Sequence, residues 1–194
     1  MALLSLQQDR PALWADFGFY GLVVAVLAGL SLYWLPPLHR LQGLAWVWAG
    51  LGGWTLAEYA LHRFVLHGLQ PFKRWHALHH ARPVELIATP TALTAVLFAG
   101  LMAAPAAWLL PPWRAAALGL GVMLGYLLYI ITHHAVHHVR DGGAWLRRRQ
   151  RWHAQHHRAG SLACYGVSMP LWDHILRSAQ PQVPQRTDAV PAAR

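Results

Sequence analysis

The sequence predicts an all-α, polytopic membrane protein with about four transmembrane helices and a cytoplasmic, histidine-rich helical cap that holds a dimetal site. Two observations lead to this prediction. Charged residues make up only 12% of the chain, about half the usual share of a soluble domain, and most of them lie between four long apolar segments. The sequence also has 14 histidines, and all but His39 fall in or beside two of the connections.

The four apolar segments are each close to the ~20 residues that cross a hydrocarbon core. In lipid they must be helical, because no water satisfies their backbone groups. Buried helices of a soluble protein are the alternative, and four such runs in 194 residues argue against it. The predicted spans are residues 17–35, 41–61, 86–110 and 115–132.

The distribution of basic residues predicts the orientation. Most Lys and Arg lie between the second and third spans or after the fourth. The positive-inside rule places those regions, both chain termini and the histidine clusters in the cytoplasm. The net charge of +9 therefore has a topological explanation, and no nucleic-acid partner is expected.

The domain organisation is expected to be simple. Residues 1–179 are predicted to form one integral membrane domain, and residues 180–194, rich in Pro, Gln and Ala, a flexible tail. The first 16 residues lack the features of a cleaved signal peptide. Cys164 is the only cysteine, so a disulfide within the chain and a cysteine-rich zinc site are both excluded.

Four spaced histidine clusters follow the second and fourth spans in the same order. Residues three and four apart share a helix face, so His76 is expected to lie beside both His79 and His80. His153, His156 and His157 form a second cluster with the same spacing. The other two clusters are the four-spaced pair His133/His137 and the five-spaced pair His62/His67. The candidate ligands are His62, His67, His76, His79, His80, His133, His137, His153, His156 and His157.

Ten imidazoles are too many for one ion and suit two ions with about five each. Neutral imidazole binds iron, zinc, copper and nickel. His62 and His67 are five residues apart and diverge on an ideal helix, and Gly68 predicts a helix end that lets His67 reach a different ion. Spacing alone leaves His134/His138 open as an alternative to His133/His137.

A few residues near the clusters are candidates for orienting the ligands. Glu58 lies four residues before His62, so its carboxylate is predicted to accept the outer N–H of that imidazole, or else to be an ordinary interface charge. Asp173 has the same two interpretations, and His138 is a further candidate. His39 is expected to be an interface residue.

The histidine motifs resemble those of the fatty acid hydroxylase and sterol desaturase superfamily, and most closely the membrane fatty acid 2-hydroxylases. The resemblance rests on Glu58–His67, on Gly125–Tyr129 leading into His133, and on Tyr165–Asp173. It covers roughly residues 53–177. One departure is Ile130, which stands where the 2-hydroxylases often carry Asp.

The resemblance implies an all-α membrane enzyme with two iron ions that uses O2 to hydroxylate or desaturate a lipid, and it favours His133 and His137 as ligands. Zinc is possible in purified material, since imidazole accepts both metals. The chain holds no recognisable cytochrome b5 domain, so a separate donor such as a ferredoxin or a cytochrome b5-type protein is expected to supply electrons. The alternatives are a histidine-site membrane metallohydrolase and a non-catalytic metal-binding membrane protein.

Overall fold

The computed structural model describes residues 6–180, and within this range the chain is helical with no β-strand. An isolated bridge between Gln7 and Ile87 ties the residues just before the first helix to the start of the third predicted span. The all-α prediction is confirmed. The predicted flexible tail lies, apart from Gln180, outside the described residues.

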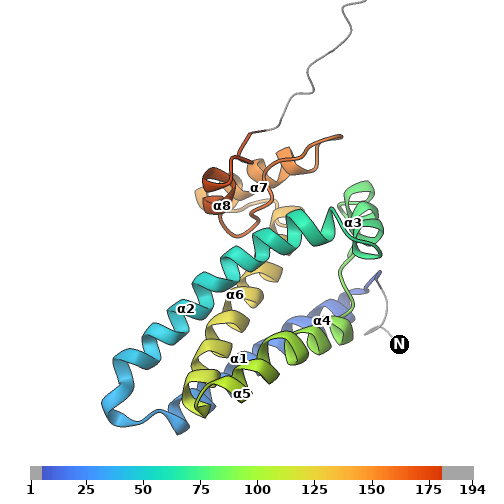
Figure 1. Ribbon diagram of the computed structural model, residues 1–194. Helices are drawn as coiled ribbons and strands as arrows, with labels where there is room; N and C mark the ends of the chain where they lie inside the picture. The colour runs from blue at the N-terminus through green and yellow to red at the C-terminus, as the bar shows by residue number, and fades with distance from the viewer. Residues whose placement is uncertain (1–5, 181–194) are drawn as a thin grey trace, which may run out of the picture.

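The long helices run alternately toward and away from one end of the molecule, where the short helices gather (Figure 1). Asp9 caps the first helix by accepting a hydrogen bond of 2.8 Å from the backbone N–H of Ala12. The elements are α1 (Arg10–Trp34), η2 (Pro37–His39), α2 (Arg40–Ala60), η3 (Leu61–Leu66), α3 (Phe72–Ala81), α4 (Thr91–Phe98), η4 (Ala99–Ala103), α5 (Ala104–Leu109), α6 (Pro112–His138), α7 (Ala144–His156) and α8 (Leu171–Ile175).

Helices α2 and α6 run side by side toward the cap and approach closely through glycines (Figure 1). A Cβ atom on Gly50 would lie 2.2 Å from the carbonyl oxygen of Leu118, and one on Gly121 would lie 2.0 Å from that of Val47. Only glycine fits at both positions. Small residues allow helices to pack this closely in lipid, where van der Waals contact replaces the hydrophobic effect.

Three helical segments of residues 6–180 are long and apolar enough to cross a membrane: α1, the continuous segment Thr91–Leu109, and α6. Helix α2, the second predicted span, is not among them. Its 21 residues include four glycines and three tryptophans, which score near zero on hydropathy scales and dilute its apolar character. The structure thus supports a membrane protein, and the count of four spans stays a prediction.

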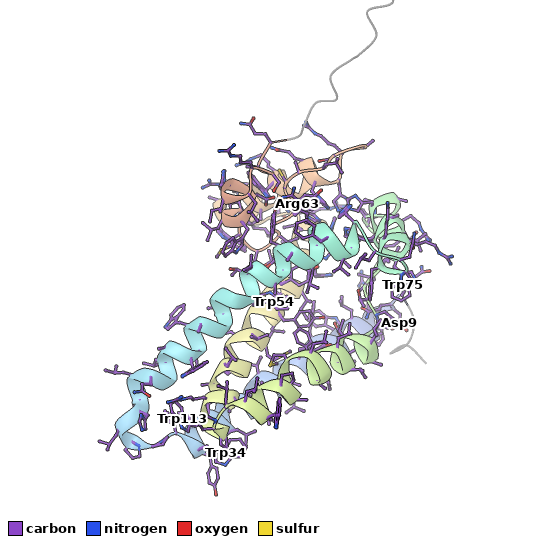
Figure 2. All side chains as sticks on the ribbon, viewed as in Figure 1. Asp9, Trp34, Trp54, Arg63, Trp75 and Trp113 are labelled. Carbon is purple, nitrogen blue, oxygen red and sulfur yellow. The ribbon has the colours of Figure 1, made fainter. Side chains whose placement is uncertain are left out.

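The outer surface of these helices carries large apolar side chains. Leu32, Leu101 and Trp108 are all more than three quarters exposed, as expected for residues that face lipid rather than water. At the end remote from the cap lie Trp34 and Trp113 (Figure 2), and His39 stacks on Trp113 with 5.3 Å between ring centroids. His39 is thus far from the other histidines, as predicted.

The cap is formed by α3, α7, α8 and the segment that joins α7 to α8, and it covers the ends of α2 and α6 (Figure 1). Trp172 of α8 donates an N–H to the hydroxyl of Thr55 on α2 at 3.0 Å, which fixes the cap to α2. Every predicted metal ligand lies in this region or at the helix ends below it.

Candidate metal centre

The histidines converge on two separate clusters. The first, here called cluster A, contains five imidazoles whose ligand atoms all lie within 4.8 Å of one another: His62, His67, His76, His80 and His156. The second, cluster B, contains His79, His133, His137 and His153 on the same criterion. His157 joins cluster B through its Nε2 atom, which lies 3.0 Å from Nε2 of His153. All ten predicted ligands are therefore brought together.

A π-helix places His62 and His67 in the same cluster. Residues Leu61–Leu66 form this helix, and the N–H of His67 donates to the carbonyl oxygen of His62 at 3.2 Å. Because a π turn bonds residue i to i+5, five-residue spacing brings the two side chains to one face. The expectation that His67 would reach a different ion is wrong, since it assumed an α-helical turn.

The two histidine motifs of identical spacing, one on α3 and one on α7, distribute their residues between the clusters in opposite ways. Helix α3 gives His76 and His80 to cluster A and His79 to cluster B. Helix α7 gives His156 to cluster A, whereas its four-spaced pair, His153 and His157, lies in cluster B. Each short helix therefore spans both clusters, and the stacked rings of His80 and His157, 4.1 Å apart, lie between them.

The nitrogen geometry fits a metal ion in each cluster. Nε2 of His76 lies 3.0 Å from that of His62 and 3.1 Å from that of His80, and in cluster B Nε2 of His137 lies 2.9 Å from that of His153. Two nitrogens bound about 2.1 Å from one ion at roughly a right angle are about 3 Å apart. Several lone pairs facing one another would repel, and a shared cation removes that repulsion.

Burial keeps the cap imidazoles neutral, which is the form that binds metal. Burial, with a smaller contribution from neighbouring histidines, lowers the pKa of His67 to about 4, of His79 and His156 to about 3 and of His157 to about 2. At neutral pH each of these rings therefore keeps a single N–H and one free nitrogen lone pair, so metal binding does not have to displace the second proton of an imidazolium.

The carboxylates contact the backbone rather than the imidazoles. Glu58 accepts hydrogen bonds of 2.8 Å from the N–H groups of Val167 and Ser168, not from His62. The Nδ1 atom of His62 instead lies 2.6 Å from the carbonyl oxygen of Tyr165. The predicted contact between Glu58 and His62 is absent because the segment after α7 folds over the end of α2 and occupies the carboxylate.

Asp173 has the same role on the other side of this segment. Its two carboxylate oxygens accept the N–H groups of Tyr165 and Gly166 at 2.9 and 2.8 Å, and its side chain is fully buried. Sequence reasoning missed the carbonyl oxygens of Ala163 and Tyr165, which accept from His156 at 2.9 Å and from His62. A backbone contact leaves no residue-type signal that could have revealed it.

The remaining histidines lie away from the clusters. His134 stacks on His138 at 4.5 Å and contacts Phe17 of α1, and neither His134 nor His138 belongs to a cluster. Among the described residues, no hydrogen bond joins His138 to a candidate ligand, so its predicted orienting role has no support. His174 packs on Trp152 at 5.5 Å.

An apolar cavity of about 240 Å³ leads from the membrane helices to the histidines. Its walls include Phe17 of α1, Trp54 of α2, Leu97 of α4 and Tyr129 of α6. Both clusters contribute to its lining, through His62 and His76 from cluster A and His79, His133 and His137 from cluster B.

A helical membrane protein with two histidine clusters at the end of an apolar cavity belongs to the class of membrane metalloproteins that act on hydrophobic molecules. The sequence profile of the fatty acid hydroxylase family matches residues 47–178, which include every candidate ligand. The chain belongs to this family, and the resemblance predicted from its motifs is confirmed. It is thus a membrane oxidoreductase of the lipid-hydroxylating type.

Known relatives agree with this assignment. The chain is 32% identical to the dihydroceramide fatty acyl 2-hydroxylase FAH2 of Arabidopsis thaliana, over 85% of this chain and 70% of the relative. It is 31% identical to the ceramide very long chain fatty acid hydroxylase scs7 of Schizosaccharomyces pombe, over 68% of this chain and 41% of the relative. It is 28% identical to the human fatty acid 2-hydroxylase, over 68% and 38% of the two chains.

One solved structure shares the fold. The visible hydroxylase domain of full-length scs7p superposes with a TM-score of 0.78 at 24% identity, over 94% of this chain and 70% of that one. At this identity the likeness establishes the fold, and the chemistry must be argued from the clusters themselves.

Proposed function

We propose that this chain is an integral membrane di-iron oxygenase that hydroxylates the acyl chain of a lipid with O2 and external electrons. The observation that carries the proposal is the meeting of both histidine clusters with one apolar cavity. An acyl chain has no polar handle, so only a hydrophobic passage can bring its carbon atoms to a metal centre.

The chemistry requires a redox metal. Inserting oxygen into a C–H bond is a two-electron oxidation, which acid–base side chains alone cannot carry out, whereas iron together with O2 can. The protein contributes binding and orientation: ten neutral imidazoles hold the two ions, and the cavity walls exclude water and align the chain. The balanced reaction joins a C–H bond, O2, two electrons and two protons to give a C–OH group and water.

The names of the relatives suggest which carbon reacts. Three of those described above are 2-hydroxylases or ceramide hydroxylases, and a 2-hydroxylase attacks the carbon next to the acyl carbonyl. We therefore propose that the substrate is an acyl lipid hydroxylated at this carbon, with desaturation as the alternative outcome. The two electrons would come from a separate donor such as a ferredoxin or a cytochrome b5-type protein.

We further propose that α2 is a fourth membrane crossing. Its 21 residues reach about 31 Å at 1.5 Å per residue, enough for the hydrocarbon core, and it lies beside α6 along its length. Four crossings put both termini and the cap on one side. The arginines of α7 and the basic residues between α2 and α4 favour the cytoplasmic side.

A metallohydrolase at the same histidines is the second candidate, but the carboxylates weigh against it. Hydrolysis needs a general base near the metal-bound water. Glu58 and Asp173, the two acidic residues singled out beside the clusters, are both buried and already accept backbone N–H groups. Neither is free to take a proton from water.

The deciding experiment combines metal analysis with lipid analysis. Protein purified in detergent after expression with added iron should contain about two ions per chain, and cells expressing it should accumulate a hydroxylated lipid. Two ions without any lipid change, even with a reductase and donor added to the purified protein, would favour the hydrolase. Protein that binds no metal would refute the proposal.

A further inference from the structure

The two clusters differ in what holds their imidazole rings. In cluster A, Nδ1 of His62 and Nδ1 of His156 donate to the carbonyl oxygens of Tyr165 and Ala163. In cluster B, Nδ1 of His79, His153 and His157 is buried without a hydrogen-bond partner among the described residues. The backbone after α7 therefore orients ligands in cluster A alone.

This backbone is fixed by two buried carboxylates. The four consecutive N–H groups of residues 165–168 all donate to a carboxylate, the first two to Asp173 and the last two to Glu58. The hydroxyl of Ser168 adds a hydrogen bond of 2.5 Å to Glu58, and that of Ser178 adds one of 2.8 Å to Asp173. Six hydrogen bonds to the two carboxylates therefore hold this segment in place.

A carbonyl oxygen can only accept, so the proton of each of these two imidazoles must lie on Nδ1. The lone pair then lies on Nε2, which faces the cluster. Such an outer hydrogen bond fixes the ring and makes the ligating nitrogen more basic, and its loss typically costs 10–100-fold in metal affinity. Protein groups alone make these contacts, so the rings are set before an ion binds.

We infer that Glu58 and Asp173 are positioning residues that act through the backbone of residues 163–168, and that they make cluster A bind its metal ion more tightly than cluster B. Helices α3 and α7 supply ligands to both clusters, so the free-energy cost of ordering these two helices applies to both sites. The clusters differ in whether a backbone carbonyl oxygen accepts a hydrogen bond from the Nδ1 atoms of their buried imidazole rings. The inference rests on the dimetal site of the proposed function but not on its oxygen chemistry.

A zinc titration of the metal-free protein in detergent tests this, with a chromophoric chelator as competitor. The expected result is two binding steps that differ at least tenfold in affinity. His67→Ala, in cluster A, should remove the tighter step, and His133→Ala, in cluster B, should remove the weaker one. Two ions bound with equal affinity, or the opposite assignment of the steps, would overturn the inference.

The carboxylates are tested by Asp173→Asn and Glu58→Met. Asp173→Asn places an NH2 group against the N–H of Tyr165 or of Gly166, since each of these donates to a different oxygen. Glu58→Met removes the one oxygen that accepts from both Val167 and Ser168. Each variant should therefore weaken the tighter step 10–100-fold and leave the weaker step unchanged. Asp16→Asn is the matched control, because Asp16 is also a buried carboxylate that accepts a hydrogen bond, from Thr91, yet contacts neither cluster. Both of its binding steps should be unaltered.

A general loss of structure would lower both steps together, and that outcome in both carboxylate variants would refute the positioning role. If Asp173→Asn does not fold, Glu58→Met decides alone, because Glu58 holds the other half of the same segment. Failure of lipid hydroxylation with an intact two-step titration would defeat the proposed function and leave this inference standing. Absence of any zinc binding would refute both.

Discussion

The Nδ1 atom of His62 lies 2.6 Å from the carbonyl oxygen of Tyr165, a residue 103 positions later in the chain. This contact joins η3, the helical continuation of α2, to the segment that closes the cap. It also determines the tautomer of His62, because the carbonyl oxygen cannot donate. One backbone atom thus decides which nitrogen of a candidate ligand faces the ion.

The adjacent histidines His133 and His134 provide a matched test of the ligand assignment. His133 lies in cluster B, and His134 packs against Phe17 outside both clusters. We expect His133→Ala to contain about one ion per chain fewer and to lose activity by several orders of magnitude, whereas His134→Ala keeps its metal. Elemental analysis of the two purified variants checks this, and equal metal content would contradict the assignment.

Gly50 and Gly52 test the close packing of α2 on α6. A methyl group at position 50 would meet the carbonyl oxygen of Leu118 at 2.2 Å, whereas nothing lies within 4 Å of one at position 52. Gly50→Ala should destabilise the protein by about 1–3 kcal/mol, as overpacking usually does. Gly52→Ala should be neutral or stabilising by up to ~1 kcal/mol, since alanine favours the helix. Thermal unfolding followed by tryptophan fluorescence measures both.

Leu97 and Leu101 test the role of the cavity. Leu97 lines it, whereas Leu101, one turn later on the same helical segment, is 77% exposed on the outer surface. A tryptophan at position 97 should fill the cavity and reduce hydroxylation at least tenfold without loss of metal. Leu101→Trp should retain activity, and equal activity of the two variants would exclude the cavity as the substrate passage.

The single thiol should be unreactive in the folded protein. Cys164 is fully buried, and burial with the nearby charge of Asp173 raises its pKa from 9.0 to about 11. At pH 8 a maleimide should label it only after unfolding. A raised pKa favours folding below the pKa of the unfolded thiol, so this contribution is lost as the pH rises from about 9 to about 11. A smaller decrease in melting temperature over this range in Cys164→Ala would confirm the sign.

Sequence reasoning predicted the all-helical fold and the ligand set because both depend on local spacing and composition. It placed His76 beside His80 correctly from their four-residue separation. It could not assign His79 and His80 to different clusters. Adjacent residues point in different directions around a helix, and which cluster each side chain joins depends on where the neighbouring helices lie.

The other errors arose where the backbone departs from ideal geometry or supplies the contact itself. The five-residue interval from His62 to His67 signals a π turn only when their convergence is already known. Glu58 was expected to accept from His62 or to be an ordinary interface charge, but it is buried and its partners are backbone N–H groups more than a hundred residues away. Such partners carry no sequence signature.

Because Cys164 is buried, it should not react with a thiol reagent in intact cells, and an introduced cysteine can be labelled there on its own. A cysteine introduced at the exposed Arg148 of α7, or at the exposed Leu38 near the opposite end, would be the only thiol open to reagent. A membrane-impermeant maleimide added outside the cell would then modify one of these two positions and spare the other. The side of the bilayer that bears the histidine clusters would follow directly from which one it modifies.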